Sequence, residues 1–204
     1  MAQALGRGEL DSLRSTQGSS IAFKEWALVC ASTLRGETSL IFRKGGIAEG
    51  REGFRFRHQR FFLFPTFFHE QADRLRIDAP IIEPEPDVVT FSAYVHVEFT
   101  RWIEDLSVLQ SLADLHILKP EVLEQRFAYD DPKGLHVAMI RAFRVAPVWS
   151  LPVQKSFGGC RSWVELPDAP TELRFTPVVD DSEQAARKAQ VLTAVGEKRS
   201  VIGE

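Results

Sequence analysis

The sequence predicts an α+β protein in which a mixed, mostly antiparallel sheet curls, or closes into a small barrel, under two to four helices. Residues 89–100 alternate without a break between apolar and polar side chains, as a half-buried strand does. A second long apolar run, GLHVAMIRAFRV, is suited to pair with it. Around these runs lie shorter segments with apolar residues at helical spacing, bounded by glycine and proline. Long strands followed by separate helices indicate the α+β class.

The first 18 residues are polar and glycine-containing and show no period, which predicts a loose N-terminal arm. Over residues 21–35, apolar residues recur at helical spacing behind a serine and before Gly36, so we expect a helix there. The alternative is that residues 27–32 form the first strand of a hairpin. The next run, TSLIFR, predicts a short buried strand that ends at the double glycine 45–46.

In GFRFRHQRFFLFP, phenylalanines alternate with arginines, which predicts a half-buried strand. A bulge or turn at residues 58–60 would restore the alternation before Pro65 ends the strand. Thr66 can cap a helix over residues 67–75. The segment 79–87, with three prolines between acidic residues, is the best candidate for an internal linker.

The C-terminal half predicts two short helices in SVLQSLADL and PEVLEQRF, a third strand in CRSWVEL and a last helix in DDSEQAARKAQVLTAV. The alanines of the last helix are too small to bury much surface, so we expect it to be peripheral. The predicted organisation is one domain over residues 19–167 and a C-terminal extension over residues 168–204.

Composition places the chain among ordinary globular proteins, with 204 residues, 44% hydrophobic and 26% charged. The net charge of -3 excludes a generally basic, histone-like binder. The N-terminus lacks the apolar segment of a signal peptide, and no apolar run is long enough to span a bilayer, so we expect a cytoplasmic protein without membrane contacts. In that setting Cys30 and Cys160 are expected to be buried free thiols.

Four motifs, FKEWALVC, IFRKGGIAEG, FFLFPTFFHEQ and GGCRSWVEL, resemble a bacterial family known only as a domain of unknown function. The resemblance spans Ile21 to Pro167 and implies no particular activity. The opening of the chain also resembles ASCH and related PUA-like β-barrels, which bind RNA or modified nucleosides. Gly36 and Arg43 match that pattern, but Thr38 replaces its lysine and Ile41 its glutamate, so the resemblance implies binding and not nucleoside hydrolysis.

Positive charge gathers in one stretch: residues 42–60 contain six Arg or Lys and two Glu. Two cations directly before two glycines suit an anion such as phosphate, and the alternative is a solvated turn. Arginines beside aromatic side chains suit single-stranded nucleic acid, although alternation places Phe54 and Phe56 on the opposite face from their arginines, where they would be core. Trp26 is a further stacking candidate. The candidate ligand-binding residues are Arg43, Lys44, Gly45, Gly46, Arg55, Arg57, Arg60 and Trp163.

Candidates for acid or base catalysis are weaker. His69 and Glu70 are adjacent, but Asp73 stands where a zinc-binding HExxH motif has its second histidine. His96 and Glu98 share the polar face of one long strand with Tyr94, and His136 lies on the other, so pairing of the strands could gather them on one surface. The alternative is a solvated sheet face. We expect no metal and no cofactor.

The sequence therefore predicts a non-catalytic nucleic-acid or nucleotide-binding domain, with single-stranded RNA or DNA, or a nucleotide, as partner. A small hydrolase or nuclease-like enzyme and a protein-interaction module are the alternatives. The oligomeric state has no signal in the sequence.

Overall fold

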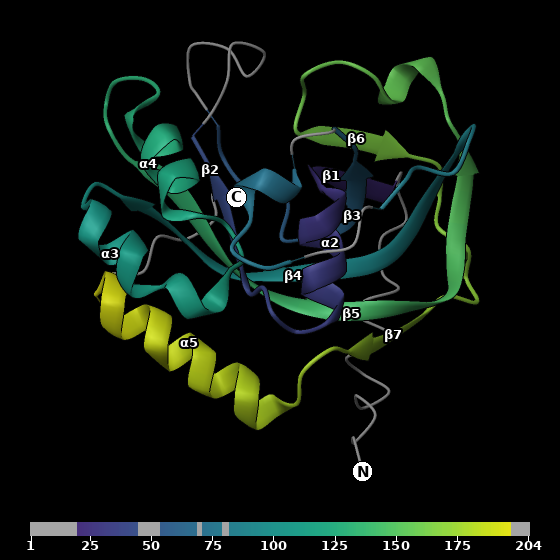
Figure 1. The fold of residues 1–204 in the computed structure, drawn as a ribbon. Coiled ribbons are helices and arrows are strands. Elements are labelled where there is room, and N and C mark those ends of the chain that lie inside the picture. Colours follow the sequence, from purple (N-terminus) through teal and green to yellow (C-terminus); the bar gives the residue numbers. More distant parts are fainter. Residues whose placement is uncertain (1–19, 45–53, 69–70, 79–81, 197–204) are drawn as a thin grey trace.

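In the computed structural model, which describes residues 20–44, 54–68, 71–78 and 82–196, one mixed sheet organises the molecule. Its order is β2-β5-β4-β3-β1-β6, with β7 also paired to β5; β1 and β3 run parallel and the other described pairs are antiparallel. Within the described residues β2 and β6 do not pair, so the sheet is curled and open (Figure 1). This confirms the predicted α+β class. The strands are β1 (Ser20–Trp26), β2 (Leu40–Arg43), β3 (Arg60–Thr66), β4 (Val88–Ile103), β5 (Leu135–Pro152), β6 (Trp163–Leu166) and β7 (Arg174–Pro177).

Four α-helices cover the described sheet. Figure 1 shows α5 along the lower side, α3 and α4 at one end, and α2 in front of the strands. The helices are α2 (Ala27–Leu34), α3 (Leu106–Ser111), α4 (Pro120–Ala128) and α5 (Asp181–Val195), with 3-10 turns η2 (Ala72–Arg74), η3 (Ala113–Leu115) and η4 (Lys155–Phe157). The predicted helices of the C-terminal half are confirmed, and α4 starts at Pro120, where the missing N–H costs no helical hydrogen bond. Among the described helices, none is long and apolar enough to cross a membrane.

The two longest strands, β4 and β5, pair along their whole length and confirm the clearest prediction from the sequence. The buried side chains of β4 alternate because successive residues of a strand point to opposite faces. Register shifts near Phe91 and near Val97 bend the pair. In Figure 1 these two strands lie below the shorter β1, β3 and β6.

The helix predicted over residues 21–35 is wrong in its first half. Ser20–Trp26 is a strand, paired with β3 on one side and β6 on the other, and only Ala27–Leu34 is helical. Two ladders satisfy the backbone of β1, and tertiary pairing of this kind overrides a local helical pattern. The helix end is as predicted, because Gly36 has φ +80° directly after the last turn.

Two further predictions in the Phe-rich stretch are corrected. Residues 54–58 are not a strand, and β3 begins at Arg60 and continues through Pro65. Past Phe62, β3 pairs with β1 alone among the described strands, so a proline without an N–H is tolerated. Of the helix predicted over residues 67–75, the described residues form only the turn η2, and the side-chain amide of Gln71 donates to the carbonyl of Thr66.

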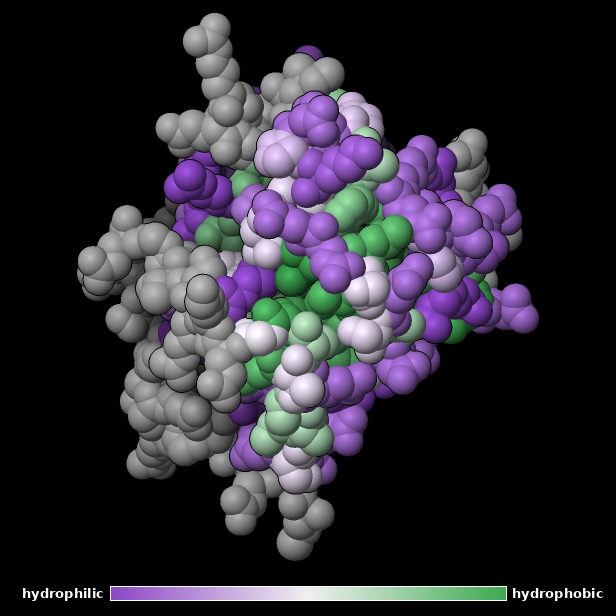
Figure 2. All heavy atoms as spheres, turned by 90° about the vertical axis from the view of Figure 1, so that its left-hand side faces the viewer, coloured by the Kyte–Doolittle hydropathy of each residue, from purple (hydrophilic) through white to green (hydrophobic). Residues whose placement is uncertain are grey.

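Three apolar clusters hold these elements together. One lies between the sheet and the helices, one inside the curl of the sheet, and one on its other face. Phe54 and Phe56 belong to the second cluster, as the core interpretation of that stretch expected. The end of the molecule that carries the helices shows a narrow apolar strip between hydrophilic side chains (Figure 2). The arm over residues 1–18 and residues 79–81 of the predicted linker lie outside the described residues, and the domain boundaries stay predictions.

Candidate functional site

Two hollows adjoin on the side of the sheet where β1, β2 and β6 end. We call the first, of about 460 Å³, the cationic pocket, and the second, of about 510 Å³, the aromatic pocket. Ser162, in the loop before β6, lines both, so the two pockets are neighbours, and we refer to them together as the cleft. The cationic pocket is lined by Lys24, Trp26, Phe42, Arg43, Lys44, Thr66, Arg74, Gln125, Arg126, Tyr129, Cys160 and Ser162.

The cationic pocket brings together five positive side chains from four separate parts of the fold. Lys24 lies on β1, Arg43 and Lys44 at the end of β2, Arg74 on η2 and Arg126 on α4. Its described lining contains no carboxylate. Basic side chains gathered in one concavity whose described lining holds no acid raise the local positive potential and attract anions.

Arg43 is held by a buried acid behind the pocket wall. Its guanidinium lies 3.0 Å from a carboxylate oxygen of Glu25, and it donates to the carbonyl of Lys24 and stacks 4.5 Å from the ring of Phe23. Glu25 is 3% exposed and also accepts from the backbone N–H of Trp26. The buried carboxylate needs this cation, so Arg43 has both a structural partner and a place in the pocket.

Among the described residues, Arg126 has no salt bridge, and the nearby acid Glu25 is paired with Arg43. The guanidinium of Arg126 lies 4.7 Å from the ring of Trp26 and donates to the carbonyl of Phe42. Burial lowers the pKa of Arg126 to about 10; Arg43 and Arg74 act in the same direction and Glu25 opposes them. A guanidinium in this environment is stabilised when an anion binds beside it.

The two lysines are anchored at the rim. Lys44 donates to the carbonyls of Phe127 and Pro132 and lies over the ring of Trp102. Lys24 donates to the carbonyls of Gly158 and Gly159. Burial lowers the pKa of both amino groups. The carbonyl partners fix the ammonium groups at the edge of the pocket without neutralising them.

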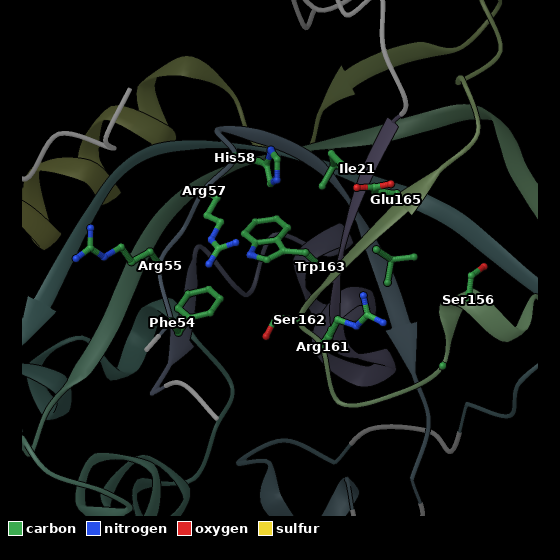
Figure 3. Close-up of a pocket in the computed structure, with 12 residues that line it drawn as sticks. Ile21, Phe54, Arg55, Arg57, His58, Ser156, Arg161, Ser162, Trp163 and Glu165 are labelled. Carbon is green, nitrogen blue, oxygen red and sulfur yellow. The ribbon is translucent and has the colours of Figure 1, made fainter. Parts of the chain in front are cut away.

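The aromatic pocket is built around Trp163 (Figure 3). The indole is stacked at 8° on Phe54, with 6.4 Å between ring centroids, and meets the ring of His58 edge-on at 4.9 Å. Burial lowers the pKa of His58, and Arg57 acts in the same direction, while Glu165 opposes it. The charged and polar residues of this pocket are Arg55, Arg57, His58, Ser156, Arg161, Ser162 and Glu165.

Most predicted ligand-binding residues lie at this cleft. Arg43 and Lys44 line one pocket and Arg55, Arg57 and Trp163 the other. Arg60 does not, because it lies opposite His96 in the pairing of β3 with β4. Trp26 lines the cationic pocket, and Gly45 and Gly46 lie outside the described residues.

Sequence analysis missed Lys24, Arg74, Arg126, Arg161 and Glu165. Arg126 is isolated on a helix far along the chain from Arg43, and Lys24 was assigned to a helix, so neither had a local signal. Cys160 is exposed at the cationic pocket, which corrects the expectation that both thiols are buried; both are free.

Among the described candidates for catalysis, His96 and Glu98 lie near each other on β4, but His136 does not join them. His96 lies opposite Arg141, whereas His136 lies at the far end of the strand pair, opposite Trp102. Glu98 accepts from Gln184 and is paired with Lys188 at 2.9 Å, both on α5. His69 and Glu70 lie outside the described residues. Among the side chains that the structure describes, no three His, Cys, Asp or Glu are grouped to hold a metal ion.

Comparisons with known proteins found one family model and distantly similar solved structures. A family model described as "Domain of unknown function (DUF1802)" matches residues 22–190. Curated proteins gave no match. Among solved structures, the ASCH protein from Zymomonas mobilis is similar with a TM-score of 0.40 and 10% identity, covering 89% of this chain and 96% of that one. A point mutant of the same protein gives a TM-score of 0.42 and 12% identity over 73% of this chain and 91% of the other.

Proposed function

Since this chain belongs to the DUF1802 family, whose description names no activity, we propose a function from the cleft itself: the protein binds single-stranded nucleic acid without cleaving it. The observation that carries the proposal is the cationic pocket, in which Lys24, Lys44 and Arg126 converge beside the Arg43–Glu25 pair and the described lining holds no carboxylate. A phosphate backbone supplies the missing negative charge.

The neighbouring aromatic pocket supports a single-stranded ligand. Unpaired bases can leave their stack and lie against aromatic rings, which duplex bases cannot do without first separating. Trp163 and His58 provide rings in the aromatic pocket, and Arg57 and Arg161 line the same wall. The net charge of -3 over the whole chain limits such binding to this local surface.

A salt titration tests the proposal. We expect short fluorescent single-stranded RNA or DNA to bind with a log–log salt slope of about -2 to -3, as three or four neutralised phosphates produce. Replacing Arg126 by methionine should weaken binding about tenfold and reduce that slope by about one unit. RNA and DNA arms measured side by side identify the preferred strand.

The matched control is Arg174→Met, an exposed cation on β7 that lines neither pocket. It should leave both affinity and slope unchanged. Absence of binding at low salt, or equal losses in the two variants, would contradict the proposal.

A further inference from the structure

The aromatic pocket contains two features that phosphate binding does not use. Glu165 is the one carboxylate in its described lining, and it is exposed to the cavity side of β6. The indole N–H of Trp163 is buried and has no acceptor among the described residues. A buried donor without an acceptor costs free energy, so a ligand atom that accepts from it would be stabilising.

Strand geometry places these two groups together. Trp163 and Glu165 are two residues apart on β6, so their side chains leave the same face, while Val164 and Leu166 are buried on the other. Figure 3 shows Glu165 beside Ile21 and the indole near the centre of the pocket. The carboxylate oxygens of Glu165 thus lie at one wall of the pocket, and the indole lies between that wall and Arg57, with its N–H on the side away from Glu165 (Figure 3).

Guanidinium groups supply the remaining donors. Figure 3 shows Arg57 beside the indole of Trp163 and Arg161 on the opposite side of the pocket, while Arg55 also lines the pocket but extends away from the indole. The pocket therefore presents two carboxylate oxygens as acceptors on one side and N–H donors on the others. Its volume of about 510 Å³ lies within the range of pockets that hold a small molecule.

We propose that the aromatic pocket receives a guanine base of the bound strand, an inference that rests on the proposed function. Guanine carries two adjacent donors, N1–H and the 2-amino group, which match the two oxygens of Glu165. Its O6 and N7 acceptors match an arginine or the Trp163 N–H. Adenine and cytosine offer an amino group beside a ring acceptor, and uracil offers a single N–H between two carbonyls, so each leaves one carboxylate oxygen facing an acceptor.

The test compares adenine-only six-nucleotide strands with the same strands carrying one central guanine, cytosine or uracil. Wild-type protein should bind the guanine strand about tenfold more tightly than the others. Glu165→Gln should remove most of that preference, because an amide offers one acceptor where the carboxylate offers two. The control Glu172→Gln makes the same charge change at an exposed residue that lines neither pocket and should keep the preference.

The outcomes separate this inference from the function beneath it. Guanine preference that Glu165→Gln abolishes and Glu172→Gln preserves would support the proposal. Salt-dependent binding with equal affinity for all four strands, or a guanine preference that survives Glu165→Gln, would overturn it and leave nucleic-acid binding intact. Failure to bind any strand at low salt would overturn both.

Discussion

The cationic pocket and the underside of α5 are both rich in charge, but they differ in how the positive charge is balanced. Beneath α5, Lys188 is paired with Glu98, and Arg141 with Asp181. In the cationic pocket, cations from four parts of the fold line one hollow, and the adjacent buried carboxylate, Glu25, is paired with Arg43.

The difference teaches that a count of charges does not identify a binding surface. Both regions combine basic side chains with histidine or aromatic neighbours, and each contains candidates from the sequence: Arg43 and Lys44 in the pocket, and His96 and Glu98 near α5. The two regions differ in their counterions. Under α5 the paired acids come from the protein itself, whereas the cationic pocket has room for an anion from solvent.

The largest effect is expected where the pocket does have its own acid. Arg43→Met would leave the Glu25 carboxylate buried and unpaired, which should lower the free energy of unfolding by about 3 to 5 kcal/mol. Chemical denaturation measures it. Arg43→Lys keeps a charge and should lose less, and if both variants were as stable as wild type the pairing would not be structural.

The second-largest effect is expected from acid, which should destabilise the region around His116. Burial lowers the pKa of His116 to about 4, and Arg76 and Arg126 act in the same direction. Above pH 6.5 His116 is neutral in both the folded and the unfolded state. Between about pH 6.5 and 4 it is protonated in the unfolded chain but stays neutral in the folded chain. Its contribution to stability is therefore lost between about pH 6.5 and 4, roughly 3 kcal/mol in all.

Denaturation curves recorded across this pH range measure the effect. His116→Gln should flatten the dependence, although its neutral side chain loses the hydrogen bond that the imidazole accepts from Leu118 N–H. An unchanged slope in the variant would assign the acid sensitivity to other groups.

The smallest effect sharpens the comparison most. Arg141→Met removes a paired cation under α5 and should cost about 0.5 to 1 kcal/mol, since Asp181 is exposed. Arg126→Met removes a cation that like charges and burial disfavour, so stability should stay within about 1 kcal/mol or rise while binding falls. Thermal melts of both variants measure these effects. If Arg126→Met were clearly more destabilising than Arg141→Met, the charge of Arg126 would already be stabilised within the folded protein.

Elements with one uninterrupted period were predictable from the sequence. In β4 the alternation runs without a break, α4 begins at the predicted Pro120, and α5 begins behind the capping side chain of Asp180. Residues 20–34 pass from strand to helix with no glycine or proline between them. The sequence pattern there combines the spacing of a strand with that of a helix, and it was interpreted as one helix. The four-residue β7 shows no pattern long enough to detect.

The cleft was predictable only in part. Arg55 and Arg57 are close to one another in the sequence, and charge clustering pointed to them. The pairing of Arg43 with Glu25 and the approach of Arg126 depend on how β1, β2 and α4 meet, which local pattern does not encode. For the same reason α5, expected to be peripheral, inserts the fully buried Val191 into the core beneath the helices.

Ser162 belongs to both pockets, and this continuity has a consequence for ligand length. Under the proposed function, a strand seated in one pocket holds its next nucleotides beside the other at a high effective concentration, so the second contact costs little additional entropy. Affinity should then not grow evenly with each added nucleotide. It should rise steeply once the strand is long enough to span both pockets and level off beyond that. The affinity of the cleft would then depend on strand length as well as on charge.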